Sequence, residues 1–222
     1  MGLKLYYNTF SQPSRAVYLF LKLNNIPFEK KIVNLMAGEH KKDEYKKINP
    51  LSLVPVIDDN GFIVRESVGI LRYLVREKNL PDHWYPKDSL AQARVDEYLE
   101  WQHVGLRIHL AMFVRVKKLF PMMTGKPPAS NLLERSLKET VNSCNTFEKI
   151  YLSSDKKFLF GNELSIADLM AAMELEQPQM AGYDPREGRP KLASYLENVR
   201  AATNPHYDEV CEVIYSFLES KS

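Results

Sequence analysis

Two short stretches carry residue types that suit a small peptide-like ligand with a carboxylate. Val54-Pro55 heads an apolar run, where a proline after a β-branched residue favours a backbone fixed for docking over a ladder strand. Glu66-Ser67 stands where the next helix should begin, and a helix N-terminus attracts anions. By themselves these residues fit an ordinary turn, an edge strand and a helix cap better, but the rest of the chain reverses that balance.

Ser11 is the best candidate for reactive chemistry, because it stands between a predicted strand and a predicted helix. Its ordinary role there is that of an N-cap. The same hydroxyl can donate to a ligand thiolate, and lowering a thiol pKa from about 8.5 by about two units needs roughly 2.7 kcal/mol. A hydrogen bond to a charged group supplies about 1.5–3 kcal/mol, and the helix end adds roughly 0.3–1 kcal/mol. One well-placed serine therefore suffices, although Tyr7, at the end of the predicted strand, is a rival donor.

The elements that position these residues follow from the hydrophobic periodicity of the first 80 residues. Strands are predicted at residues 3–7, 28–33, 54–57 and 62–64, with a hairpin turn between the last two. Helices are predicted from Ser11 to about Asn24 and from Glu66 to about Lys78. The order β-α-β-(α)-β-β-α predicts an α/β thioredoxin-like domain at residues 1–79.

The rest of the chain reads as helix and predicts an all-α helical-bundle domain. A proline-bounded linker at residues 80–88 precedes it, so the second domain spans residues 89–222. Residues 89–120 form a long pattern with two apolar faces, one for the protein's own core and one for another cover, and Pro121 should break it. Ser165 and Asp168 have the spacing of a capping box, and the helix after them is apolar almost all round.

The composition is that of an ordinary globular chain without an excess of either charge. Hydrophobic residues make up 45% of the 222 residues, and 30 Lys and Arg stand against 28 Asp and Glu. This balance favours neither nucleic acid nor a membrane surface as a partner. No apolar run reaches the length of a membrane span and the N-terminus has no signal-peptide layout, so we expect a cytoplasmic protein. Cys144 and Cys211, embedded in helical patterns, predict small core residues.

Several segments, in order along the chain, resemble the theta class of the cytosolic glutathione transferases and its insect delta and epsilon relatives. They are residues 8–17 (NTFSQPSRAV), 84–86, 93–103, 164–168 and 188–192. The resemblance implies a glutathione transferase fold and an enzyme that conjugates the thiolate of reduced glutathione to small hydrophobic electrophiles in detoxification, with peroxide reduction as a side activity. Glutathione is a co-substrate, and no metal or redox cofactor is implied.

The resemblance also assigns roles to individual residues. Ser11 matches the catalytic serine that hydrogen-bonds the glutathione sulfur. The residues that match the glutathione-binding set are Gln12, His40, Lys41, Val54, Pro55 (a cis-proline in the family), Glu66 and Ser67. The expected wall of the second-substrate pocket, between the two domains, is Phe10, Leu35, Met36, Arg107 and Phe113. Whether the last helix covers this pocket stays open.

Two positions depart from the class. Leu53 stands where theta members often carry a lysine, and Val104 stands where some place a polar residue that reaches the partner subunit's glutathione. Both departures predict a low glutathione affinity, and they leave open a non-catalytic carrier of apolar ligands on the same fold. A glutathione-dependent isomerase or dehalogenase is a further alternative. The family habit and the second apolar face of residues 89–120 predict a homodimer.

Overall fold

The first part of the chain folds into a four-stranded mixed sheet with the strand order β2-β1-β3-β4. The computed structural model describes residues 2–219, and the side chains of residues 2–217. The strands are β1 (Leu3–Tyr7), β2 (Glu29–Ile32), β3 (Val56–Asp59) and β4 (Phe62–Arg65). β1 runs parallel to β2 and antiparallel to β3, and β3 and β4 form the hairpin.

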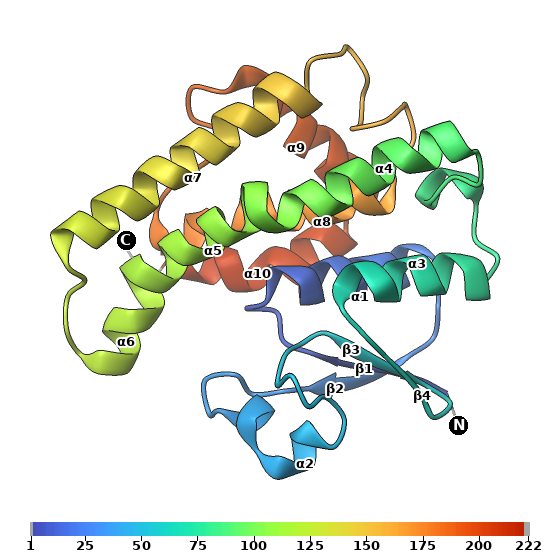
Figure 1. Cartoon of the computed structure of the whole chain (residues 1–222), viewed down its shortest axis with the longest axis horizontal. Coiled ribbons are helices and arrows are strands. Elements are labelled where there is room, and N and C mark those ends of the chain that lie inside the picture. Colours follow the sequence, from blue (N-terminus) through green and yellow to red (C-terminus); the bar gives the residue numbers. More distant parts are fainter. Residues whose placement is uncertain (1, 220–222) are drawn as a thin grey trace.

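Helices lie on both sides of this sheet, and the alternating burial of β1 shows that one of its faces is the more deeply buried. The helices of this part are α1 (Gln12–Leu23), η1 (Glu39–Lys41), α2 (Asp43–Lys46) and α3 (Ser67–Glu77). In Figure 1, α1 and α3 lie between the sheet and the helical domain, whereas α2 lies on the other side of the sheet. Leu3, Leu5 and Tyr7 of β1 are buried in the core beneath α1. The thioredoxin-like prediction is therefore confirmed.

Strand β3 begins two residues later than the sequence pattern predicts. Pro55 has no backbone N–H to give to a ladder, so pairing starts at Val56, opposite Arg65. At its other end β3 continues to Asp59, so Asn60 and Gly61 alone form the hairpin turn, and Asn60 adopts a positive φ of 55° there. The peptide bond between Val54 and Pro55 is cis, as the family resemblance implies.

The second part is entirely helical, as predicted. Its elements are η2 (Asp82–Trp84), α4 (Ser89–Gln102), η3 (His103–Arg107), α5 (Ile108–Val114), η4 (Arg115–Leu119), α6 (Phe120–Thr124), α7 (Ser130–Tyr151), α8 (Ile166–Glu176), η5 (Gln177–Ala181), α9 (Pro190–Thr203) and α10 (His206–Glu219). Every residue of α8 is buried, because α1, α4 and α9 pack around it. The capping box of Ser165 and Asp168 is formed at its N-terminus. No helix within residues 2–219 combines the length and the apolar character needed to cross a bilayer.

The long helix runs further than its sequence pattern indicates, and the expected break at Pro121 is wrong. α4, α5 and α6 are joined by two π-helical turns, η3 and η4. Pro121 falls in the first turn of α6, where a missing N–H is tolerated, and the helix ends at Gly125 with a φ of 68°. Each π turn shifts the helical register by one residue, which re-aims the side chains that follow it.

Candidate active site

The loop that carries Ser11 is fixed from several sides. The Asn8 amide donates to the carbonyl of Val33 at 2.9 Å, and its side-chain oxygen accepts from the backbone N–H of Phe10 at 2.9 Å. Arg15, fully buried in α1, donates to the carbonyl of Thr9 at 2.7 Å. The amide of Gln177, from the distant helix η5, reaches the carbonyl of Phe10 at 3.2 Å. Both domains therefore hold the backbone just before Ser11.

The side chain of Ser11 makes two contacts. Its oxygen caps α1 by accepting from the backbone N–H of Ser14 at 3.4 Å. Its hydroxyl points at the carbonyl of Val54, 3.5 Å away across the fold. A distance of 3.5 Å is at the upper limit for a hydrogen bond, so the hydroxyl proton can turn to a better acceptor at little cost.

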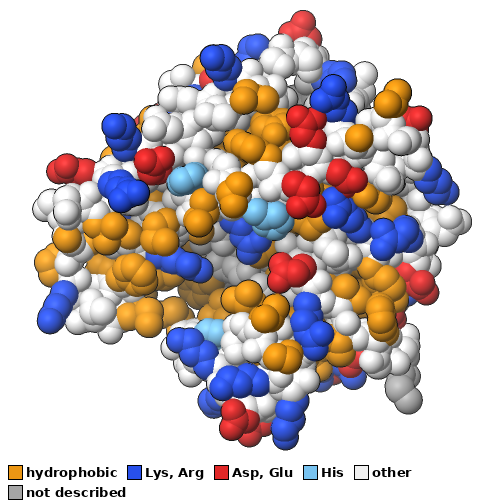
Figure 2. Space-filling model, viewed as in Figure 1, with side chains coloured by type: hydrophobic (Ala, Val, Ile, Leu, Met, Phe, Trp, Pro, Cys, Tyr) orange, Lys and Arg blue, Asp and Glu red, His pale blue; other side chains and the backbone are white. Residues whose placement is uncertain are grey.

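Ser11 and Val54 face a cavity of about 300 Å³ between the two domains. Figure 2 shows a hollow there, between the helical part and the segment around α2. The residues that line it are Phe10, Ser11, Gln12, Leu35, Met36, His40, Ser52, Leu53, Val54, Arg107, Ala111, Val114, Arg115, Leu119, Gln177 and Met180. Apolar side chains make up much of this wall, and Ser11, His40 and Arg107 are among its polar groups. Such a cavity suits an apolar ligand with a polar reactive end.

His40 and Lys41 behave differently in the structure. His40 lines the cavity, and its Nδ1 is buried without a hydrogen-bond partner among the described residues. Burial, and then the neighbouring charge of Lys41, lowers the pKa of His40 below its ordinary value. Lys41 is exposed and does not line the cavity. An unpartnered ring nitrogen at a cavity wall is ready to bind a ligand's polar group.

Glu66 and Ser67 stand at the start of α3, beside the cis-proline. The β3–β4 register pairs Val56 with Arg65, so Pro55 and Glu66 follow at the same end of the hairpin. Glu66 is exposed with a φ of 64°, a region that a non-glycine residue enters only under constraint. Ser67 is 3% exposed at the first position of the helix. Neither residue lines the cavity.

Two further candidates, Tyr7 and Phe113, lie in the protein core and not at the cavity. The phenol of Tyr7 belongs to the core: the ring is 5% exposed and packs against Tyr18 with centroids 5.2 Å apart. Burial raises its pKa, which makes it a weaker donor. Phe113, an expected wall residue, is 1% exposed and packs against Tyr183 with centroids 5.9 Å apart. The expectation for Phe113 is wrong, because its face of α5 turns into the helical core.

Two wall residues that we did not predict, Ala111 and Arg115, could have been found from helical periodicity. They follow the predicted Arg107 at intervals of four residues, which places all three on one side of the helix. Gln177 and Met180 come from η5, and no local pattern ties them to this cavity. The last described turn of α10 also approaches, because Phe217 contacts Phe10 with ring centroids 5.8 Å apart.

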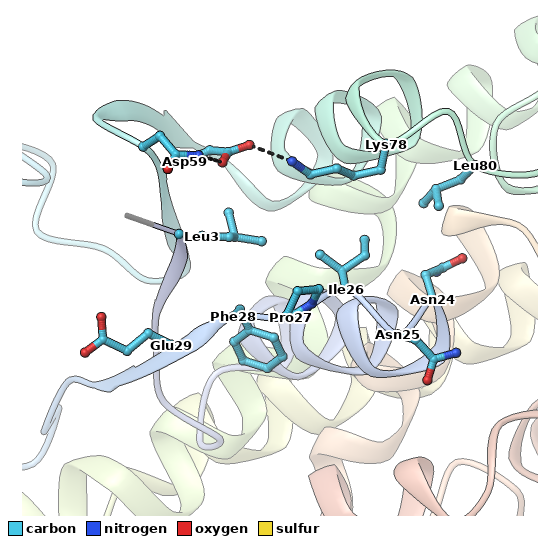
Figure 3. Close-up of a pocket in the computed structure, with 12 residues that line it drawn as sticks. Leu3, Asn24, Asn25, Ile26, Pro27, Phe28, Glu29, Asp59, Lys78 and Leu80 are labelled. Carbon is cyan, nitrogen blue, oxygen red and sulfur yellow. Dashed lines mark hydrogen bonds and ion pairs between the residues drawn. The ribbon is translucent and has the colours of Figure 1, made fainter.

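A second, larger cavity of about 690 Å³ lies at the other end of the sheet (Figure 3). The loop of residues 24–29 forms one side of it, and Asp59 and Lys78 form the other. Asp59 is already engaged, since it accepts from Lys78 at 3.0 Å and from the Tyr73 phenol at 3.1 Å. We place the active site at the smaller cavity, because that is where the candidate reactive groups converge.

Two family models match this chain. The family model described as glutathione S-transferase, N-terminal domain, matches residues 10–77, and the model described as glutathione S-transferase, C-terminal domain, matches residues 111–202. Bovine (Bos taurus) glutathione S-transferase theta-1 is 44% identical over 222 residues, which cover 100% of this chain and 92% of the relative. The chain belongs to the glutathione S-transferase family.

Solved structures agree with this assignment and with the theta class. Human glutathione S-transferase T1-1 in its apo form is 45% identical, with a TM-score of 0.92 and coverage of 96% of this chain and 89% of that one. Human glutathione transferase theta-2, in complex with glutathione and an unknown ligand, is 40% identical, with a TM-score of 0.93 and coverage of 98% and 89%. This theta-class glutathione transferase therefore conjugates glutathione, and the prediction of a transferase is confirmed.

Proposed function

We propose that the Ser11 hydroxyl stabilises the thiolate of bound glutathione. The observation that carries this role is the position of Ser11 Oγ, 3.5 Å from the Val54 carbonyl at the cavity wall and at the N-terminus of α1. The helix end favours a nearby negative charge, and the weakly held hydroxyl proton is free to turn to the sulfur. The thiolate then forms a bond to the electrophilic carbon, and the leaving group departs with the bonding electron pair.

The rest of the glutathione site is proposed from the residues around Ser11. The backbone at Val54, ahead of cis-Pro55, receives the cysteinyl unit. Glu66 and Ser67 receive the γ-glutamyl end, where the N-terminus of α3 supports a carboxylate. His40 and Lys41 face the glycine carboxylate, with His40 as the residue at the cavity. Gln12 completes this set from the first turn of α1.

The cavity between the domains is proposed as the second-substrate pocket for small hydrophobic electrophiles. Phe10, Leu35 and Met36 form its apolar wall on the side of the first domain, and Arg107 faces them from the long helix. Holding the electrophile against a preformed thiolate accelerates the reaction chiefly by positioning. We propose that the chain divides into a first domain at residues 1–79, a linker at residues 80–88 and a second domain at residues 89–222. Each domain then supplies one wall of the pocket.

The decisive experiment is the ultraviolet absorbance of the thiolate of bound glutathione, measured against pH. The native protein should show a thiol pKa well below the free value of about 8.5, and in Ser11→Ala it should rise by about two units. At a pH below the pKa of the free thiol, turnover of Ser11→Ala should fall in the same proportion as its thiolate fraction. Tyr7→Phe is the matched control, because it also removes one hydroxyl near the end of β1, and it should leave the pKa unchanged.

Two results would contradict this assignment. A low thiol pKa that survives Ser11→Ala would remove Ser11 from the role, and a shift in Tyr7→Phe would transfer it to the phenol. Apolar-to-Ala changes at Leu35 and Met36 test the pocket separately. If they leave the affinity for the electrophile untouched, the wall assignment fails while the Ser11 role stands.

We also propose that the enzyme works as a homodimer. Val104, Ile108 and Met112 form a row along one side of the long helix and are 68%, 50% and 36% exposed. Hydrophobic side chains gather over α5 and α6 on the face shown in Figure 2. An exposed apolar row of this kind is typical of a protein interface. A cytoplasmic location remains a prediction from the sequence.

A further inference from the structure

A carboxylate is buried at the centre of the molecule, next to the proposed pocket. Glu174 lies on α8 between the apolar residues Met173 and Leu175, and it is 0% exposed. Its two oxygens have no hydrogen-bond partner of standard geometry among the residues that the structure describes. Burying an acid in this way is costly, so a group that only filled space would be better served by a leucine or methionine.

Arg107 connects this carboxylate to the pocket. The Nε of Arg107 lies 3.5 Å from Oε1 of Glu174, and the Arg107 side chain, 28% exposed, lines the cavity. Arg15 is the other nearby cation, but its guanidinium donates to the carbonyl of Met173 at 3.0 Å and to Gln177 Oε1 at 2.7 Å. Arg15 is thus committed to holding α1 on α8, whereas Arg107 stands between Glu174 and the ligand space.

We propose that Glu174 is a positioning residue that sets how strongly Arg107 attracts a negatively charged second substrate. This inference rests on the proposed assignment of the cavity as the second-substrate pocket. When Glu174 is ionised, it draws the Nε edge of Arg107 and offsets its charge. When Glu174 is protonated, the full charge of Arg107 is left to the pocket. Charge on Glu174 and an anion in the pocket therefore compete for one guanidinium.

The surrounding groups place this competition near neutral pH. Burial raises the pKa of Glu174 to about 7, against the opposing effects of Arg107 and Arg15 and of the Gln12 amide. Tyr98, which faces Glu174 from α4, has its own pKa raised by burial and stays neutral.

The two histidines near the pocket titrate lower. Burial, and then the charge of Arg107, lowers the pKa of His103 below its ordinary value. His40 is shifted in the same direction, again mainly by burial. Glu174 is thus the described group around Arg107 that changes charge near pH 7.

The test compares two unreactive ligands of the same size, naphthalene-1-carboxylate and naphthalene-1-carboxamide. Their dissociation constants are measured between about pH 5.5 and 8.5 on the protein loaded with S-methylglutathione, whose sulfur carries no titratable proton. We expect the carboxylate to bind at least about five-fold more weakly at the upper end, while the neutral amide changes little. Calorimetry in buffers of different ionisation enthalpy should show that the carboxylate takes up protons as it binds near pH 7.

Two variants isolate the carboxylate. Glu174→Gln keeps the shape and should bind the anion at all pH values as tightly as the native protein does at low pH, with no proton uptake. Glu176→Gln is the matched control: Glu176 is also fully buried on α8 but pairs with Arg186 and with the Tyr207 phenol, away from the cavity. It should lose stability and keep the native pH dependence of anion binding.

The outcomes separate this inference from the pocket assignment. If Leu35→Ala and Met36→Ala leave the affinity for both ligands unchanged, the ligands bind elsewhere, and the pocket assignment and this inference both fall. If those variants weaken binding but the anion shows no extra pH dependence, or shows it equally in Glu174→Gln, only the role of Glu174 is overturned.

Discussion

Ser11 combines a structural and a chemical task at one position. As an N-cap it stabilises α1, so its removal costs stability as well as chemistry, by about 1 kcal/mol. The two effects are separable, because the cap acts at every pH and the thiolate effect appears only with glutathione bound. Ser14, in the first turn of α1, is fully buried and does not line the cavity, so it is no substitute for Ser11 there.

Glu174 also predicts how stability depends on pH. Its native pKa of about 7 lies above the ordinary 4.5, so between these values the native state keeps a proton that the unfolded state has lost. The contribution of Glu174 to the free energy of unfolding therefore decreases as the pH rises toward 7. The full decrease is roughly 3 kcal/mol. We expect the free energy of unfolding of Glu174→Gln, relative to that of the native protein, to be higher at pH 8 than at pH 5. Urea unfolding at both pH values measures the difference, and a constant difference would show that Glu174 titrates normally.

At the scale of elements, the π turn η3 decides where Arg107 points. Gly105 lies in the middle of this turn, and a Cβ there would overlap the ring of Trp101. Trp101 in turn packs against Tyr151 of α7 with centroids 4.8 Å apart. The close approach of the indole to the backbone thus needs a glycine, and the turn that results sets the register of Arg107, two residues further on.

Gly105→Ala should therefore destabilise the protein by about 1–3 kcal/mol, because the indole has to move. Gly69→Ala is the matched control in α3, where the nearest atom to a new Cβ is Glu66 Cβ at 3.9 Å. It should be neutral, or stabilise by about 0.5–1 kcal/mol. Denaturant unfolding gives both values, and tryptophan emission should shift in Gly105→Ala. Equal stabilities of the two variants would mean that the turn adapts without cost.

At the scale of the whole molecule, the long helix faces in two directions. Leu99, Leu106 and Leu110 are fully buried against the molecule's own core. The opposite side carries the row of Val104, Ile108 and Met112, which a second copy of the chain would cover. The pocket residue Arg107 lies on the same helix, so a partner at this row would stiffen the pocket wall.

Ile108→Asp should convert the dimer to a monomer, since a carboxylate in an apolar interface is strongly disfavoured. Ile150→Asp is the control, because Ile150 on α7 is similarly exposed, at 56% against 50% for Ile108. Molecular mass in solution at micromolar concentration distinguishes them. A monomeric native protein would refute the dimer, and a dimeric Ile108→Asp variant would move the interface elsewhere.

The sequence by itself determined the features that depend on local rules. Strand periodicity, the hairpin at Asn60-Gly61 and the capping box of Ser165 and Asp168 each involve neighbours within a few residues. The position of Ser11 between a strand and a helix followed in the same way. These local signals, together with the motifs around residues 8–17, were enough for the fold class and the family.

The tertiary structure decided what lies opposite those residues. Strand alternation puts Tyr7 on the same face as Leu3 and Leu5, but it could not identify Tyr18 as the residue that packs on it. Helical periodicity did not show which apolar face of α5 would carry Phe113 into the core. The approach of η5 to the cavity and the contact of Glu174 with Arg107 join residues dozens of positions apart. Such contacts depend on how helices pack and on where a π turn shifts the register. A pKa shift caused by burial arises only once the surrounding chain has excluded water.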